Sequence, residues 1–135
     1  MSRTLRVGLT QWHATGDVEA NLATAVDLVR QAASAGAELV VLPENGLMLG
    51  TNTAMRERAL LESGPEIGSL RAAAAEHGVV VVLGGMKNAT AEGVFNSALV
   101  IRPRRHPCGS LRQDPSLRCT GERAVLRGEH GRELW

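Results

Sequence analysis

Short apolar runs, separated by helical patterns and turn residues, divide the first part of the chain into predicted strands and helices. The alternation over residues 5–10 and the run over residues 94–101 are typical of strands. The continuous apolar runs at residues 39–42 and 79–83 favour strands that are buried on both faces of a sheet. The first of these runs is stopped by Pro43, which cannot donate a hydrogen bond to a strand ladder.

Three segments between these strands have the pattern of helices. From Val18 the apolar positions recur at helical spacing, with Asp17 as a suitable N-cap and Gly36 as a C-terminal stop. Residues 53–62 and 65–76 form two further predicted helices. The predicted order through residue 101 is therefore β-α-β-α-α-β-β, which begins with a right-handed βαβ unit and belongs to the α/β class.

The composition is that of one soluble globular domain, but it changes abruptly at residue 102. Of 135 residues, 44% are hydrophobic and 21% are charged, and no stretch reaches membrane-spanning length. A cytoplasmic location is the default expectation because the start lacks a secretory pattern. Residues 1–101 carry seven basic and ten acidic groups, a net charge of −3, whereas residues 102–135 carry eight arginines and four acidic groups, a net charge of +4.

Glu44 is the principal candidate for a catalytic residue. It directly follows Pro43, just past the carboxyl end of the strand predicted over residues 39–42. Open α/β sheets place functional residues at that edge, and a carboxylate beside apolar surface suits a general base or acid. The alternative is a solvated loop glutamate, which an isolated Pro-Glu pair would favour.

The other candidate residues carry weaker signals. His13 follows the first predicted strand without a partner in the sequence, which favours a surface or loop histidine. Cys108 and Cys119 form neither a disulfide framework nor a metal-ligand set. Gly84 and Gly85 lack the spacing of a phosphate-binding loop. We therefore expect no metal and no organic cofactor.

Four segments with a shared pattern follow one another between residues 5 and 101. They are Arg-Val-Gly-Leu-Thr-Gln at 6–11, Gly-Ala-Glu-Leu-Val-Val-Leu-Pro-Glu at 36–44, His-Gly-Val-Val-Val-Val-Leu-Gly-Gly at 77–85 and Phe-Asn-Ser-Ala-Leu-Val-Ile at 95–101. Together with Asn21 in the first helix, they resemble the N-terminal part of the nitrilase superfamily, the carbon–nitrogen hydrolases. The resemblance implies a partial α-β-β-α sandwich followed by an irregular C-terminal tail.

The resemblance implies hydrolysis of a small amide or nitrile by a Glu-Lys-Cys set. In that chemistry the cysteine attacks the substrate carbon, the glutamate activates the cysteine and later water, and the lysine helps to stabilise the oxyanion. Glu44 matches the family's glutamate. No cofactor, membrane or nucleic acid is implied, and a homo-oligomer of the family type is left open for this chain.

The resemblance ends where the family's lysine and cysteine should follow. Lys87 is the single lysine and lies in the wrong place, while Cys108 and Cys119 match no family motif. We therefore interpret residues 1–101 as the N-terminal part of a carbon–nitrogen hydrolase domain and residues 102–135 as a non-homologous basic tail. Without its partners Glu44 should not catalyse hydrolysis, and missing strands should make the chain fold poorly.

A shift of the reading frame near Pro103 would account for the basic tail. When the codons of residues 111–119 are read from their second base, they permit Tyr-Asp-Lys-Ile-His-Leu-Phe-Asp, which resembles the family's lysine segment. The same shift permits Asp-Gly over residues 104–106 and Arg-Ser-Tyr-Ala-Glu-Ser over residues 124–130. We predict that residues 104–135 are translated out of frame, and that the intact enzyme resembles amidases acting on small ω-amido acids or deaminated glutathione.

Two alternatives remain open from the sequence. One is a genuine basic tail over residues 102–135 that binds nucleic acid or an acidic partner. Against it, the tail has no clear helical or strand period and contains one aromatic residue, Trp135, to stack on a base. The other is a stable, non-catalytic α/β module that binds small molecules or the intact enzyme.

Overall fold

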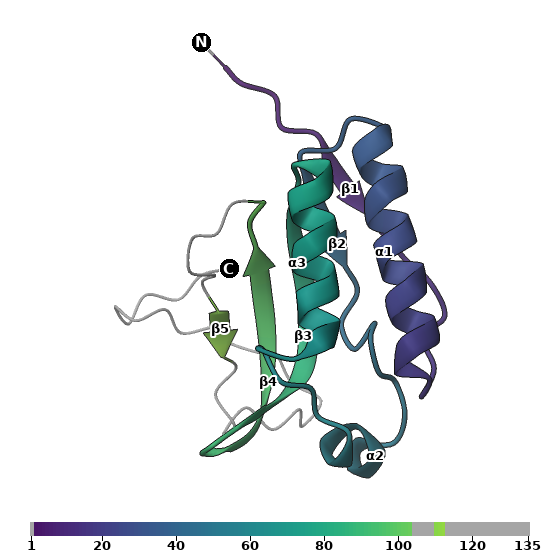
Figure 1. Cartoon of the computed structure of the whole chain (residues 1–135), viewed down its shortest axis with the longest axis vertical. Coiled ribbons are helices and arrows are strands. Elements are labelled where there is room, and N and C mark those ends of the chain that lie inside the picture. The colour runs from purple at the N-terminus through teal and green to yellow at the C-terminus, as the bar shows by residue number, and fades with distance from the viewer. Residues whose placement is uncertain (1, 104–109, 113–135) are drawn as a thin grey trace, which may run out of the picture.

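Five strands form one mixed sheet in the order β1-β2-β3-β4-β5 (Figure 1). The structure is a computed structural model that describes residues 2–103 and 110–112. β1, β2 and β3 are parallel to one another, whereas β4 runs antiparallel to both β3 and β5. The strands span Val7–Leu9 (β1), Leu39–Leu42 (β2), Val80–Thr90 (β3), Gly93–Ile101 (β4) and Ser110–Arg112 (β5).

Three helices connect the parallel strands: α1 (Val18–Ser34), α2 (Asn52–Glu57) and α3 (Pro65–His77). The predicted N-cap of α1 is confirmed, and a glycine ends α3. The Asp17 side chain accepts a 3.0 Å hydrogen bond from the backbone N–H of Ala20 at the start of α1. Gly78 closes α3 in the left-handed conformation, with φ of 66°.

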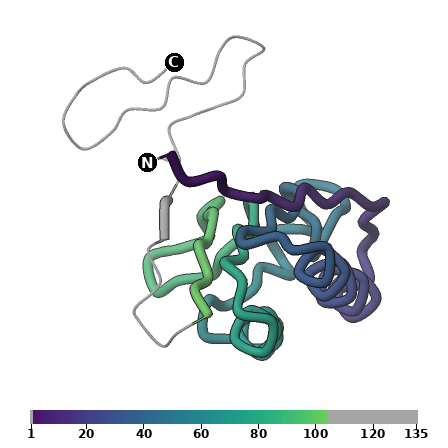
Figure 2. Tube along the Cα trace, turned by 90° about the horizontal axis from the view of Figure 1, so that it is seen from above, coloured from purple at the N-terminus to yellow at the C-terminus, as the bar shows by residue number. Residues whose placement is uncertain are grey.

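The hydrophobic core lies between the sheet and the two long helices. α1 and α3 pack side by side on one face of the sheet, as both views show (Figures 1 and 2). The strands β2, β3 and β4 supply alternate residues to this core, as expected from the period of two in a β-strand. The largest fully buried apolar side chains are Val29, Val40, Leu42, Leu47, Ile67, Leu70, Val81, Leu83, Leu99 and Ile101.

The opposite face of the sheet is apolar, and no described helix covers it. A Cβ atom built on Gly8 would lie 2.8 Å from Ala32 of α1, so Gly8 faces the helices and its neighbours Val7 and Leu9 face away. Val7 is 43% exposed and Leu9 is 80% exposed. The register places further apolar side chains on the same face, namely Leu39, Val41, Val80, Val82 and Val100.

The predicted order of elements through residue 101 is confirmed, but several boundaries differ. The helix predicted over residues 53–62 ends at Glu57, because Leu60 is taken up in backbone hydrogen bonds with Lys87 and Ala89 of β3. The first strand is shorter than the predicted span of residues 5–10. The sequence alone did not show that the chain after α2 pairs with the sheet.

The strand predicted over residues 79–83 continues to Thr90, well beyond the predicted end. It crosses Gly84 and Gly85 through a shift in register, because Leu83 pairs with Leu99 whereas Met86 pairs with Ser97. This irregularity is a β-bulge, in which extra residues on one strand face fewer on its partner. Only Ala91 and Glu92 separate β3 from β4, so the two strands form a hairpin with a tight turn.

A short segment of the tail joins the sheet. β5 pairs antiparallel with residues 97–99 of β4, so residues 110–112 form a strand that the sequence pattern did not predict. Predictions that concern residues 104–109 and 113–135, including those for Cys108 and Cys119, lie outside the described residues. Within the described part of the chain, no helix is long and apolar enough to span a membrane.

Candidate active site

Glu44 lies just past the carboxyl end of β2, at the edge of the sheet that the sequence predicted. Its side chain is exposed, and Asn96 of β4 donates a hydrogen bond from Nδ2 to Glu44 Oε1 over 3.1 Å. The two residues are 52 positions apart in the sequence. The site is therefore formed by the end of one parallel strand and the middle of an antiparallel strand.

The bulge at Gly84 and Gly85 allows the backbone after β2 to approach β3 closely. A Cβ atom on Gly84 would lie 2.6 Å from the carbonyl oxygen of Leu42, which is closer than a real Cβ can approach. A Cβ atom on Gly85 would lie 3.0 Å from Cγ of Glu44. Glycine is required for this close approach at Gly84 and favoured at Gly85 because a side chain would push the glutamate away from β3.

The backbone turns sharply directly after Glu44. Asn45 adopts the left-handed conformation, with φ of 53°, and its N–H donates a 2.8 Å hydrogen bond to the carbonyl oxygen of Gly85. Asparagine tolerates this conformation better than most residues. The N–H of Gly46 donates to the carbonyl oxygen of Pro43 over 3.2 Å, which closes the turn. The turn directs Glu44 away from the core while its backbone is held to the bulge.

The side chain of Asn21 in α1 holds the loop after Glu44 in place by hydrogen bonds. Its Nδ2 donates to the carbonyl oxygens of Thr15, over 2.8 Å, and Leu47, over 3.0 Å, and its Oδ1 accepts from the Thr15 N–H over 3.1 Å. Asn21 is only 3% exposed. The sequence contains a signal for this role, since Asn21 occupies the same face of the helix as the buried residues Ala25 and Val29.

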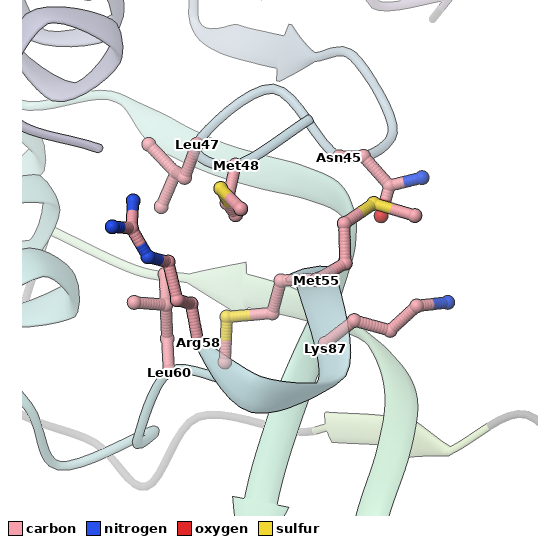
Figure 3. A pocket seen from close by; sticks show the side chains of 8 residues that line it. Asn45, Leu47, Met48, Met55, Arg58, Leu60 and Lys87 are labelled. Atoms are coloured by element: carbon pink, nitrogen blue, oxygen red, sulfur yellow. The ribbon is translucent and has the colours of Figure 1, made fainter. Parts of the chain in front are cut away.

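A small pocket lies beside the turn, under the loop that leads to α2 (Figure 3). It has room for about one water molecule, so its own side chains largely fill it. Lys87 lies at this pocket and directly opposite Asn96 in the β3–β4 pair. The residues that line the pocket are Asn45, Leu47, Met48, Met55, Arg58, Leu60, Met86 and Lys87.

The remaining residues singled out in the sequence do not join Glu44. His13 is exposed in the loop after β1. Among residues 2–103 the ion pairs are Arg3–Glu38 and Asp27–Arg30, and neither includes Glu44 or Lys87. In the same part of the chain, no group of three or more His, Cys, Asp or Glu side chains could hold a metal ion.

The fold and the site together define an α/β protein with a carboxylate held at the carboxyl end of a central parallel strand. The model of the carbon–nitrogen hydrolase family matches residues 6–113, which is most of the chain. The chain therefore belongs to the carbon–nitrogen hydrolase family. No match was found among curated protein sequences.

Solved structures of the nitrilase superfamily share this fold. XC1258 from Xanthomonas campestris, a CN-hydrolase superfamily protein with an arsenic adduct in its active site, has a TM-score of 0.63 and 25% identity over 96% of this chain. The NitFhit protein of C. elegans has a TM-score of 0.72 and 19% identity over 95% of this chain. An amidase double mutant from Nesterenkonia sp. AN1, with a glutamate and a cysteine replaced and acrylamide bound, has a TM-score of 0.68 and 20% identity over 81% of this chain.

The present chain spans less than half the length of each of these proteins. It covers 44% of the Xanthomonas protein, 30% of NitFhit and 42% of the Nesterenkonia amidase. The similarity in fold thus concerns one part of each related structure.

Proposed function

We propose that Glu44 is the general base of an amide-hydrolysing site of the Glu-Lys-Cys type. The observation that carries this proposal is the placement of the Glu44 carboxylate, which is exposed at the carboxyl edge of the sheet and held there by Asn96. A base in this position can take a proton from a thiol and later from water. The family match supports the reaction class, and the site supports the residue.

The described residues do not supply the other two groups of this mechanism. A thiol nucleophile and a cation for the oxyanion must both reach the substrate carbon that Glu44 serves. Lys87 makes no ion pair with Glu44, and no cysteine lies within residues 2–103 or 110–112. We therefore propose that this chain by itself has negligible hydrolase activity.

We propose small amides as the substrate class of the intact enzyme. The Nesterenkonia amidase supports this class, since its double mutant was solved with acrylamide. The shifted-frame segment Tyr-Asp-Lys-Ile-His-Leu-Phe-Asp favours the branch that acts on ω-amido acids or deaminated glutathione. We also propose that the intact enzyme forms a homo-oligomer and is located in the cytoplasm.

We further propose that residues 102–135 are a tail outside the hydrolase domain and that residues 104–135 are read in the wrong frame, although the family model extends to residue 113 and residues 110–112 pair with β4. The support is the family-like segment that the shifted codons permit, together with the excess of arginine after residue 101. One extra base near the codon of Pro103 accounts for both. The same gene with that base removed is called the restored gene.

An assay of ammonia release tests the proposed reaction. The chain as given and the product of the restored gene are each incubated with acrylamide and with an ω-amido acid. We expect the product of the restored gene to hydrolyse amides, and the 135-residue chain to show no activity. In the restored product, Glu44→Gln should lower the activity by at least about a hundredfold. Hydrolysis that Glu44→Gln leaves unchanged in either protein would refute the role of Glu44.

A non-catalytic binding module is the second candidate function. The apolar sheet face around Leu9 and Val82 favours it, because exposed apolar patches mark interaction sites in soluble proteins. A monodisperse chain that melts cooperatively and lacks hydrolase activity would support this alternative. Binding of nucleic acid by the arginine-rich tail would instead be revealed by a strongly salt-dependent shift with DNA.

A further inference from the structure

We propose that Asn96 is a positioning residue for Glu44, and that the bulge at Gly84 and Gly85 makes this contact possible. The inference rests on the proposed function, in which Glu44 acts as a base. It assigns a role to the double glycine, which has no phosphate-binding spacing, and to Asn96, for which the sequence analysis gives no role of its own.

The contact between Asn96 and Glu44 leaves part of the carboxylate available for chemistry. Asn96 donates to Oε1, while within the described residues Oε2 accepts no hydrogen bond. An amide N–H that donates to one carboxylate oxygen restricts the rotation of the group. The second oxygen can then accept a proton from a thiol or a water molecule.

The bulge holds Glu44 close to β3, the strand that lies between β2 and β4 in the sheet. The Gly85 carbonyl oxygen accepts from the N–H of Asn45, so the peptide next to Glu44 is fixed to β3. A side chain at Gly85 would meet Cγ of Glu44 at 3.0 Å and would also lie 3.6 Å from Oδ1 of Asn96. Gly85 thus lies directly beneath the pair, and a methyl group there would push the carboxylate out of line with Asn96.

Nuclear magnetic resonance of the Asn96 side-chain amide in the 135-residue chain tests the contact without relying on hydrolysis. As pH is lowered and Glu44 gains a proton, the Asn96 Nδ2 protons should shift, because their acceptor changes from a charged to a neutral group. The Asn88 amide is an internal control, since its Nδ2 donates to the hydroxyl of Ser97, which does not titrate in this range.

Two variants test this role, and a third serves as a control. Glu44→Gln keeps an acceptor but cannot ionise, so the Asn96 shift should disappear. A shift that persists would show that another group causes it and would overturn the proposal. Gly85→Ala should also abolish the shift, and a shift that is unchanged in this variant would overturn a positioning role for Gly85. Gly68→Ala is the matched control, because nothing lies within 4 Å of a Cβ atom there.

A kinetic measurement connects the contact to catalysis. In the enzyme from the restored gene, Asn96→Ala should lower kcat roughly tenfold to a hundredfold and leave KM nearly unchanged, as expected when a catalytic group is misaligned. An unchanged kcat would overturn the positioning role. A restored enzyme that hydrolyses no amide, even with Asn96 present, would instead contradict the proposed function while the resonance shift still reports the contact.

Discussion

The side chain of Asn21 donates a 3.0 Å hydrogen bond to the carbonyl oxygen of Leu47, and thereby joins the first helix to the loop that follows Glu44. The same amide also binds both backbone groups of Thr15. A buried amide with these three partners fixes two loops at the carboxyl edge of the sheet. The shape of the candidate site thus depends on a residue that does not touch Glu44.

Asn21→Ala should reduce the free energy of unfolding by about 1–3 kcal/mol, because it leaves the buried carbonyl oxygen of Leu47 and the partly buried N–H of Thr15 without this partner. Urea denaturation followed by circular dichroism measures the difference. Asn52→Ala is the control, since Asn52 is exposed at the start of α2. Equal stability of the two variants would show that the Asn21 network contributes little.

Gly84→Ala should destabilise the chain by about 1–3 kcal/mol, because its Cβ would press on the carbonyl oxygen of Leu42 and on the backbone of Glu44. The matched variant Gly68→Ala should instead be stabilised by about 0.5–1 kcal/mol, since alanine favours the helical conformation in open space. Thermal melting of both variants checks the difference. If Gly84→Ala is as stable as the parent chain, the close approach of β3 to the end of β2 does not require a glycine at position 84.

Leu9→Lys should reduce self-association of the chain. Leu9 is 80% exposed on the apolar sheet face, where a lysine would place a charge between surfaces that otherwise attract one another in water. Sedimentation velocity at several protein concentrations measures the change. Leu61→Lys serves as control, because Leu61 is 54% exposed but lies in the loop before α3. An equal effect of both variants would exclude the sheet face as the surface of association.

Asp27 should contribute a small, pH-dependent stabilisation. Hydrogen bonds from Arg30 and Gln31 lower the pKa of its carboxyl below the ordinary value of 3.8. A group whose pKa is lower in the folded than in the unfolded chain stabilises the fold above the unfolded pKa, and loses this effect as pH falls through the folded pKa. The stability advantage over Asp27→Asn should therefore shrink as pH is lowered from about 6 to below about 3. A constant difference across this range would contradict the assignment.

Much of the fold follows from the apolar pattern because the parallel strands are short, buried and bounded by clear signals. Pro43 marks the end of β2, Asp17 caps α1, and Gly78 closes α3. The place of Glu44 at the carboxyl edge also followed from its position after Pro43. Each of these features depends on residues that are close together in the sequence, so the sequence alone can predict it.

The rest depends on contacts between distant segments. The continuation of β3 beyond Gly84 was hidden because two glycines are typical of a turn, whereas here they form a bulge. The hydrogen bond between Asn96 and Glu44 requires the register of β3 and β4, which a single strand does not reveal. The buried role of Asn21, by contrast, could have been inferred from its phase on the helix.

Sequencing the gene from the codon of Asn96 through that of Trp135 and beyond is the most direct test of the central claim. We predict that removal of one base near the codon of Pro103 opens a frame with the lysine segment and, further on, a cysteine. Glu44 would then be the base of an amidase whose partners are lost from this reading of the gene. Absence of such a frame would contradict the claim, and the arginine-rich tail would then require a function of its own.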